Sequence, residues 1–265
     1  MNEEIRQDDF PGFWQAIGLH VELLIPVLGM SLLVLLLEDV TELHLLEHPG
    51  VLGLLELLQL IWLLRRESIR RQCAPDEIGG PWVSRYLWLL PALALIKGFW
   101  WVWSPALAWM ERTWPALHME RDFGMQISPA GAFVWIVAAG PLFEEFFYRG
   151  VILRGFVARY NQRAAVLASS LLFMAVHFYP ILYVQTFGMS VLFSWLWLRT
   201  RSVWPGVLLH MVNNLLGFVG LASSVTLLGD SGWGLPGVAA GFVLAGAGFL
   251  GLRRWAPSPR VTMED

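Results

Sequence analysis

The chain has 265 residues, a formal net charge of −3, 56% hydrophobic residues, 15% charged residues and one cysteine. Ordinary soluble domains carry about a quarter charged residues, so this composition excludes a disordered chain and leaves too little polar surface for a soluble globule. A single cysteine excludes an internal disulfide scaffold, and the charge offers no basic footprint for nucleic acid. The composition therefore indicates a polytopic membrane protein.

Apolar runs that approach the roughly 20 residues needed to cross a bilayer recur along the chain. We predict an all-α fold, a polytopic membrane bundle of about eight transmembrane helices. The predicted spans are residues 19–37, 51–64, 86–103, 131–148, 164–179, 181–198, 203–222 and 232–252. The second span is the weakest, because only a short apolar stretch separates Gly50 from Arg65. The outer loop 113–129 suits a helix that lies in the membrane interface.

The arginines set the expected orientation, because cytoplasmic loops of membrane proteins are enriched in positive charge. With the amino terminus in the cytoplasm, the outer loops carry only Arg112 and Arg121. The inner segments then carry Arg6, Arg65, Arg66, Arg70, Arg71, Arg85, Arg154, Arg159, Arg163, Arg199, Arg201, Arg253, Arg254 and Arg260. We therefore expect a multi-pass protein of the cell inner membrane with cytoplasmic amino and carboxyl termini.

The predicted span 131–148 and its edge carry Glu144, Glu145 and Arg149. Ionisable groups inside a span are candidates for function, because placing them in lipid costs free energy. Neighbouring residues on a helix project about 100° apart, so the two glutamates face different surroundings. Glu145 and Arg149 are four residues apart in the favourable order for an ion pair. We therefore predict that Glu145 pairs with Arg149, whereas Glu144 faces elsewhere.

Two later spans add imidazoles and amides. His177 follows Phe173 by one helical turn, and His210 precedes Asn214 by one turn, with Asn213 directly before that amide. Each of these residues alone is explained by hydrogen bonding between helices. A bundle that brings the three spans together would instead gather a carboxylate, two imidazoles and an amide. The joint occurrence favours an active site.

These residue types suit the hydrolysis of an amide by water. The reaction needs a general base, hydrogen-bond donors for the developing oxyanion and exclusion of bulk water. Glu144 suits the base, and a histidine bound to the same water could share that role. An asparagine amide and a second histidine suit the oxyanion, and the set has no evident covalent nucleophile.

Other polar residues receive a structural interpretation. His20, Glu22, Glu56 and Lys97 lie in predicted spans without such companions, and we interpret them as snorkelling, mutually paired or cavity-lining groups. An inverted zinc motif, His44-Leu45-Leu46-Glu47-His48, occurs in an acidic outer segment, where a chance match is plausible. Cys73 lies in a predicted cytoplasmic loop, far in sequence from the motif histidines.

Three motifs together resemble the CPBP (Abi) family of intramembrane proteases: Glu144-Glu145-x-x-x-Arg149, Phe173-x-x-x-His177 and His210-x-x-x-Asn214. That family includes the CAAX-processing type II prenyl proteases and bacterial bacteriocin-processing or self-immunity proteins. The resemblance covers about residues 130–222. It implies that Glu144 and His177 activate water, and that His210 and Asn214 stabilise the oxyanion. Glu145 and Arg149 match supporting positions, and Asn213 leaves some ambiguity about the working amide.

The resemblance divides the chain into three segments. Residues 1–130 form an amino-terminal membrane region with about three spans and the outer interfacial segment. Residues 131–222 form the CPBP/Abi-like protease core, and residues 223–265 form the last span and a cytoplasmic tail.

The resulting hypothesis is an intramembrane endopeptidase that hydrolyses a peptide bond of a membrane-associated or lipid-anchored protein or peptide. Its partners would be that substrate and the lipid bilayer, with no role for nucleic acid. One alternative is a non-catalytic membrane scaffold, immunity factor or regulator, against which the intact motifs argue. A further alternative is a proton-coupled transporter with a midplane Glu/His site, which the lack of detectable repeats weakens.

We expect no cofactor and favour glutamate-type hydrolysis over a zinc-dependent reaction. The alternative is a divalent metal such as zinc, held by Glu144, His177 and His210. These three residues come from three separate predicted helices, so no His-x-x-x-His pair positions two ligands in advance. Asn214 is moreover a poor zinc ligand but a good oxyanion donor.

Overall fold

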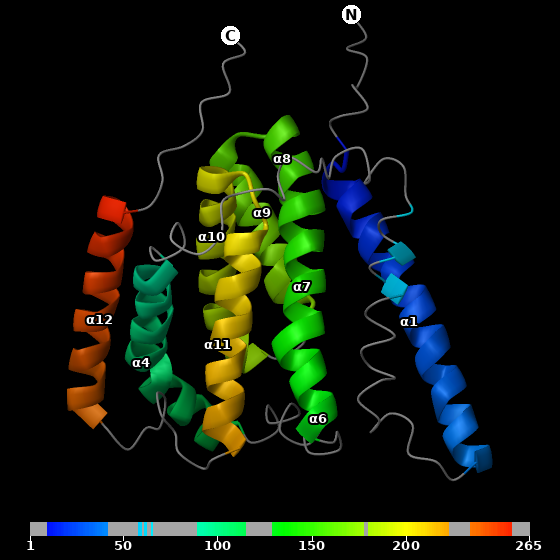
Figure 1. Cartoon of the computed structure of the whole chain (residues 1–265), viewed down its shortest axis with the longest axis horizontal. Helices are drawn as coiled ribbons and strands as arrows, with labels where there is room; N and C mark the ends of the chain where they lie inside the picture. The colour runs from blue at the N-terminus through cyan, green and yellow to red at the C-terminus, as the bar shows by residue number, and fades with distance from the viewer. Residues whose placement is uncertain are drawn as a thin grey trace, which may run out of the picture. The chain divides into compact units, whose positions relative to one another are not determined.

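The computed structural model describes residues 10–41, 58–59, 61–62, 65, 89–114, 129–177, 180–222 and 234–255 (Figure 1). Every regular element in these ranges is a helix and none is a strand, which confirms the all-α prediction for them. The chain divides into two compact units, which are described here one at a time. The first comprises Met1–Pro75 and Arg121–Ser169, and the second comprises Asp76–Glu120 and Ser170–Asp265.

A continuous helix from residue 129 to residue 159 carries the first motif and alternates between α and π geometry. Its parts are α6 (Pro129–Ala132), η6 (Phe133–Ala139), α7 (Gly140–Glu145), η7 (Phe146–Leu153) and α8 (Arg154–Arg159). A proline inside an α-helix lacks an N–H and clashes with the carbonyl four residues back. Because Pro141 stands just after η6, the wider π turns relieve that conflict. Gly140 leaves no room for a side chain, since a Cβ would lie 2.8 Å from the Trp135 carbonyl oxygen.

Helix α1 (Phe13–Thr41) starts against the end of this helix. Pro11 packs so closely on Gly155 that a Cβ at the glycine would overlap it. The backbone N–H of Phe13 donates to the Tyr160 hydroxyl at 3.3 Å, and the Phe13 ring lies 6.3 Å from that of Phe156. In Figure 1, α1 then slants away from α7 and α6. The amino-terminal region is therefore attached to the motif helix in the first unit.

The second unit is built from α4 (Leu89–Thr113), α10 (Tyr183–Thr200), α11 (Trp204–Ala222) and α12 (Gly234–Trp255). Its hydrophobic core draws on all four helices and contains Ala92, Ile96, Met189, Phe193, Leu196, Leu209 and Leu252. Helix α10 ends where Arg201 adopts the left-handed conformation, with φ of 53°, and donates its N–H to the Trp197 carbonyl. This cap turns the chain back into α11.

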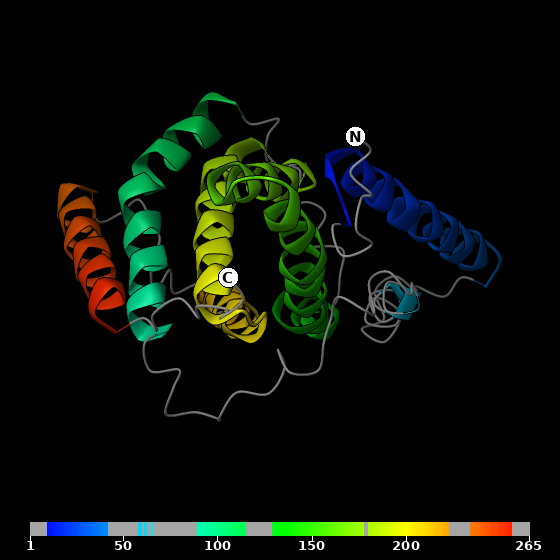
Figure 2. The ribbon, with the colours of Figure 1, turned by 90° about the horizontal axis from the view of Figure 1, so that it is seen from above.

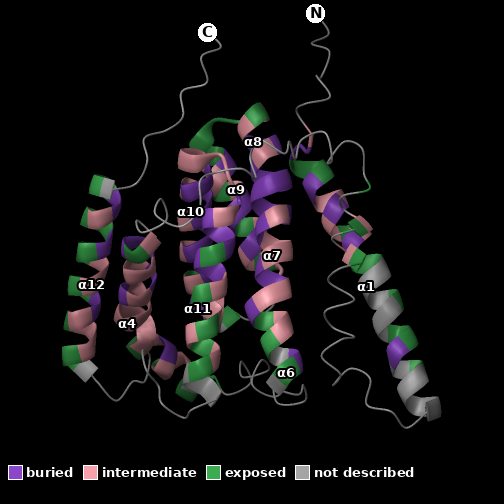
Figure 3. Ribbon diagram, viewed as in Figure 1, coloured by how far each residue is buried: buried purple, intermediate pink, exposed green. Residues whose placement is uncertain are grey.

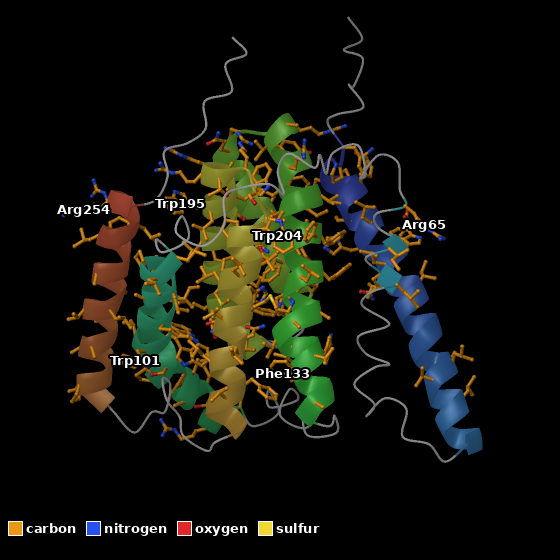
Figure 4. The ribbon with its side chains drawn as sticks, viewed as in Figure 1. Arg65, Trp101, Phe133, Trp195, Trp204 and Arg254 are labelled. Atoms are coloured by element: carbon orange, nitrogen blue, oxygen red, sulfur yellow. The ribbon has the colours of Figure 1, made fainter. Side chains whose placement is uncertain are left out.

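Helices α4 and α12 lie side by side in two perpendicular views (Figures 1 and 2). Their contact uses small residues. A Cβ on Gly98 would overlap the backbone of Ala245, and one on Gly248 would lie 2.5 Å from the backbone nitrogen of Leu95. Trp101, labelled in Figure 4, borders the same contact. Such backbone approach through small residues is typical of helix pairs in membranes.

The outer side of α12 is apolar and exposed (Figure 3). Leu235 and Val243 are 85% and 74% exposed, and their exposed neighbours are Phe242, Phe249 and Leu250. An apolar surface of this kind is typical of contact with lipid or with another protein. Arg253 and Arg254 follow in the last turn of the helix, the second being labelled in Figure 4.

Helix α9 (Gln162–Ala175) is shorter than the predicted span 164–179. Asn161 caps its start, since its Oδ1 accepts a hydrogen bond from the Ala164 N–H at 2.9 Å. The helix has 14 residues, which at 1.5 Å per residue give about 21 Å, less than the roughly 30 Å of a hydrocarbon core. The next element, η8 (Pro180–Leu182), is a single 3₁₀ turn. The predicted span is therefore not one continuous helix.

The other described helices overlap the predicted spans, although α1, α4 and the helix at 129–159 extend well beyond them. The number of transmembrane segments stays a prediction. By length and composition, one helix in the described ranges, Leu235–Arg254, is long and apolar enough to cross a membrane. Most of the predicted span 51–64, the loop 115–128, the inverted zinc motif at 44–48, Glu56 and Cys73 lie outside the described residues. The division into segments 1–130, 131–222 and 223–265 also stays a prediction.

Candidate active site

The first motif forms a cluster of ionisable side chains, which we call the carboxylate cluster: Glu144, Glu145, Tyr148 and Arg149. Arg149 Nη1 donates to Glu145 Oε1 at 3.0 Å, and both side chains are fully buried. This confirms the predicted ion pair. Water does not reach either side chain, so the two opposite charges compensate each other. Removing one residue of the pair would leave the other with an uncompensated buried charge.

Glu144 lies on the same turn in a more open environment. Its side chain is half-buried, whereas that of Glu145 is sealed. Its Oε1 lies 3.9 Å from the position that a Cβ on Gly140 would occupy, so the missing side chain of that glycine makes room beside the carboxylate. The charge of Glu144 also acts on Arg149. The two adjacent glutamates therefore occupy distinct surroundings within one helix.

A histidine from α1 completes the surroundings of the carboxylate cluster. His20 Nδ1 donates to the Ala16 carbonyl at 2.7 Å, because a carbonyl oxygen only accepts. In the neutral ring, Nε2 then accepts from the Tyr148 hydroxyl at 2.9 Å, and the ring packs against Phe147. The interpretation of His20 as a residue without companions in the motifs is thus wrong. It contacts the motif helix directly.

His177 lies in a turn just after α9, where its orientation is fixed locally. Its Nδ1 donates to the Phe173 carbonyl at 2.7 Å, and its ring lies 4.7 Å from the Phe173 ring. Since the carbonyl only accepts, Nδ1 carries the proton and Nε2 of the neutral ring holds a lone pair. In the neutral ring, the Phe173-x-x-x-His177 spacing therefore favours the tautomer whose Nε2 can accept a hydrogen bond from water.

His210 lies on α11 between two aromatic rings. It is buried, and its ring centroid lies 6.3 Å from that of Phe173 and 5.3 Å from that of Phe193. The Phe173 ring thus contacts both motif histidines within the second unit. These contacts pack the second imidazole against both rings.

Next to His210 is a second group of polar residues, which we call the amide cluster: Lys97, Asn213 and Asn214. Lys97 Nζ donates to Asn213 Oδ1 at 2.8 Å and to the Asn213 carbonyl at 3.5 Å. Asn213 Nδ2 in turn donates to Asn214 Oδ1 at 3.2 Å and contacts Met189 Sδ at 3.8 Å. The interpretation of Lys97 as lacking companions in the motifs is therefore also wrong.

Sequence reasoning missed these two long-range contacts for a clear reason. His20 and Tyr148 are 128 positions apart, and Lys97 and Asn213 are 116 positions apart. The available signal was an ionisable residue in each of two predicted spans, which does not identify a partner. The ion pair within the first motif was predictable because its members lie one helical turn apart on one element.

The candidate residues belong to both units. Glu144, Glu145 and Arg149 lie in the first unit, and His177, His210 and Asn214 lie in the second. Within the described ranges no group of three His, Cys, Asp or Glu side chains could hold a metal ion. The Nε2 lone pair of His177 suits a water or a metal equally, so metal dependence stays a prediction.

The comparison with known families agrees with the motifs. Residues 126–216 match the family Rce1-like, described as "Type II CAAX prenyl endopeptidase Rce1-like". No curated protein and no solved structure matches the chain. Over this segment the similarity agrees with the resemblance of the three motifs to the CPBP family of intramembrane proteases. Within that family, the match is to the group of type II CAAX prenyl endopeptidases. Lys97, His20 and helix α12 lie outside the matched segment.

Proposed function

We propose that this protein is an intramembrane endopeptidase that uses water, activated by Glu144 and His177, to cleave a peptide bond of a membrane-anchored substrate. The observation that carries the proposal is the hydrogen bond from His177 Nδ1 to the Phe173 carbonyl, which leaves Nε2 as the ring nitrogen that can meet a water. The three motifs and the family match over residues 126–216 support the reaction class.

In the proposed reaction, the Glu144 carboxylate takes a proton from water while His177 Nε2 accepts a hydrogen bond from the same water. The new oxygen–carbon bond gives a tetrahedral intermediate, whose oxyanion is stabilised by His210 and Asn214 as hydrogen-bond donors. The proton then passes from Glu144 to the leaving nitrogen, the carbon–nitrogen bond breaks, and a carboxylic acid and an amine are released. Glu145 and Arg149 hold the helix that carries Glu144.

The family match indicates the general class of substrate. The name of the matched family describes a prenyl endopeptidase for CAAX sequences. Such sequences end a chain and carry the prenyl group on their cysteine. We propose a substrate held at the membrane by a lipid or by an apolar segment. The exposed apolar side of α12 supports a protein that works in a bilayer.

The localisation is proposed together with the function. We expect several membrane spans in the inner membrane, with both termini in the cytoplasm, because the arginines gather on one side of the predicted topology. In intact cells, a membrane-impermeant thiol reagent should therefore not reach Cys73, and it should label it after inside-out vesicles are made. Labelling in intact cells would reverse the orientation.

The test is purification of the full chain in detergent with quenched fluorescent peptides as reporters. Peptides with a carboxyl-terminal farnesylated cysteine motif, an acylated cysteine or a plain apolar anchor distinguish the classes of substrate. Wild type should cleave at least one of them, and Glu144→Gln should lose at least about 10²-fold in rate while it folds normally. Glu22→Gln, the same carboxylate-to-amide change at a half-buried position of α1 outside the motifs, is the matched control. Full activity of Glu144→Gln would overturn the assignment.

The same preparation tests the role of metal. We propose a reaction without zinc, so exhaustive treatment with a chelator should leave the activity unchanged. Elemental analysis should then find well under one zinc per chain. Activity that is lost on chelation and restored by stoichiometric zinc would instead make Glu144, His177 and His210 metal ligands.

A further inference from the structure

The amide cluster contains more hydrogen bonds than a single oxyanion donor requires. A lysine from α4, which lies outside the matched family segment, contacts the residue next to the motif asparagine. The chain of contacts runs from Lys97 to Asn213 and from Asn213 to Asn214. Each link has a donor and an acceptor, so the chain has a direction.

The direction is fixed by the chemistry of the lysine. An ammonium group has three donors and no acceptor, so the atom of Asn213 that faces it must be the carbonyl oxygen Oδ1. The amide group of Asn213 then points away from Lys97, and its Nδ2 faces Asn214 Oδ1 and Met189 Sδ. The assignment of oxygen and nitrogen in Asn213 is thus set by Lys97.

The same logic passes to the next amide. Asn214 Oδ1 is occupied as an acceptor of the Asn213 amide, so the donor group Nδ2 of Asn214 lies on the other side of its amide carbon. An oxyanion needs a donor, and an amide that is turned by 180° would present a carbonyl oxygen to it instead. The orientation of this amide therefore decides whether it helps or opposes the reaction.

We propose that Lys97 is a positioning residue that sets the donor orientation of the Asn214 amide through Asn213. This inference rests on the proposed function, in which Asn214 stabilises the oxyanion. Hydrogen bonds in a chain also polarise one another, so the positive charge strengthens the Asn214 amide as a donor. The ambiguity between the two asparagines has a simple answer: Asn213 is the relay, and Asn214 is the amide that meets the substrate.

The sharpest test is Asn213→Asp, which keeps the bond to Lys97 and removes the donor to Asn214. A carboxylate oxygen would then face Asn214 Oδ1, and two acceptors repel, so the Asn214 amide turns over. We expect kcat to fall about 10²–10³-fold, as for loss of an oxyanion donor, with KM within about twofold. The thermal midpoint should stay near that of wild type, because Lys97 keeps a partner.

The matched control is Asn161→Asp, the same chemical change at the start of α9. Its side-chain oxygen caps the helix at an exposed site, and aspartate caps as well as asparagine does. This variant should keep the wild-type kcat and KM. Together the two variants separate the loss of the relay from a general effect of one added negative charge.

A lysine series gives a second measurement. Lys97→Met should lower kcat about 10–100-fold without raising KM, as expected for a group that acts through another. Lys97→Arg, which also only donates, should recover most of that loss. In an Asn214→Ala background, Lys97→Met should have no further effect, because the amide that it orients is gone.

The outcomes are distinguishable. If wild type cleaves a reporter and Glu144→Gln does not, but Asn213→Asp keeps the wild-type kcat, the relay alone is overturned. Full additivity of Lys97→Met and Asn214→Ala would overturn it as well. If wild type cleaves no reporter, or if Glu144→Gln cleaves as wild type does, the proposed function fails and the positioning role fails with it.

Discussion

The carboxylate cluster and the amide cluster hold their positive charges against different kinds of partner. In the first, Arg149 meets Glu145 within one turn of one helix, and both side chains are sealed from solvent. In the second, Lys97 of α4 meets a neutral amide on α11 and is only half-buried. In the buried ion pair, each charge is compensated by the other residue. In the amide cluster, the ammonium group of Lys97 fixes the orientation of the Asn213 amide, which in turn contacts Asn214. The comparison suggests that the Glu145–Arg149 pair stabilises the fold, whereas the amide cluster serves the proposed reaction.

The largest expected effect is on the sealed pair. Arg149→Met should lower the free energy of unfolding by about 3–5 kcal/mol, because Glu145 would keep a buried charge without its partner. Thermal unfolding and the yield of folded protein in detergent measure this. The double variant Glu145→Leu with Arg149→Met should be no less stable than either single variant. Additive losses would show that the two residues do not act as a pair.

The next effect separates activity from stability. His177→Ala should reduce the rate of cleavage by at least about 10²-fold and change the thermal midpoint little, because this side chain is half-buried and its hydrogen bond to the Phe173 carbonyl lies within its own turn. Combined with Glu144→Gln, it should cost much less than the product of the two single losses, since in the proposed reaction both groups act on one water. A loss of folded protein would instead place His177 with the structural residues.

The third effect tests packing beneath the amide cluster. Gly98→Ala should destabilise the second unit by about 1–3 kcal/mol, because its Cβ would meet the backbone of α12 rather than a movable side chain. Gly246→Ala on α12 is the matched control, since a Cβ there meets nothing within 4 Å. Thermal unfolding of the two variants gives the comparison. Equal stability would mean that α4 and α12 do not rely on this close approach.

The smallest effect concerns the hydrogen bond between Tyr148 and His20. Tyr148→Phe removes one hydroxyl donor and should cost about 1 kcal/mol of stability. The rate of cleavage should stay within a few-fold of wild type if this bond only attaches α1 to the motif helix. A loss comparable to that of His177→Ala would move Tyr148 from the structural to the reactive residues.

The sequence predicted features that depend on near neighbours. The ion pair within the first motif follows from a spacing of four residues, and helices α11 and α12 lie close to the predicted spans. The motif spacing of His177 and Phe173 also places the ring over its own helical turn. Local periodicity carries this information, because a helix brings residues three or four positions apart together.

Features that depend on distant contacts were not predictable. Lys97 meets Asn213 because α4 packs beside α11, and nothing around either residue in the sequence encodes that pairing. The π geometry of η6 and η7 and the early end of α9 at Ala175 were also missed. An apolar run predicts a helical segment, but it does not reveal how many residues each turn will hold or where packing ends it.

The π turns of the motif helix allow it to lose a residue without changing how the following residues face. A π turn bonds to the residue five positions along, so it holds one residue more than an α turn does. A one-residue deletion inside Phe133–Ala139 can therefore be absorbed by a return to α geometry, which leaves the following residues facing as before. The same deletion inside Gly140–Glu145 removes a residue from α geometry, which has no extra residue to lose. It would rotate the start of the helix relative to Arg149 by about 100°. Homologous chains that differ by one residue should therefore differ in η6 and keep the length of α7.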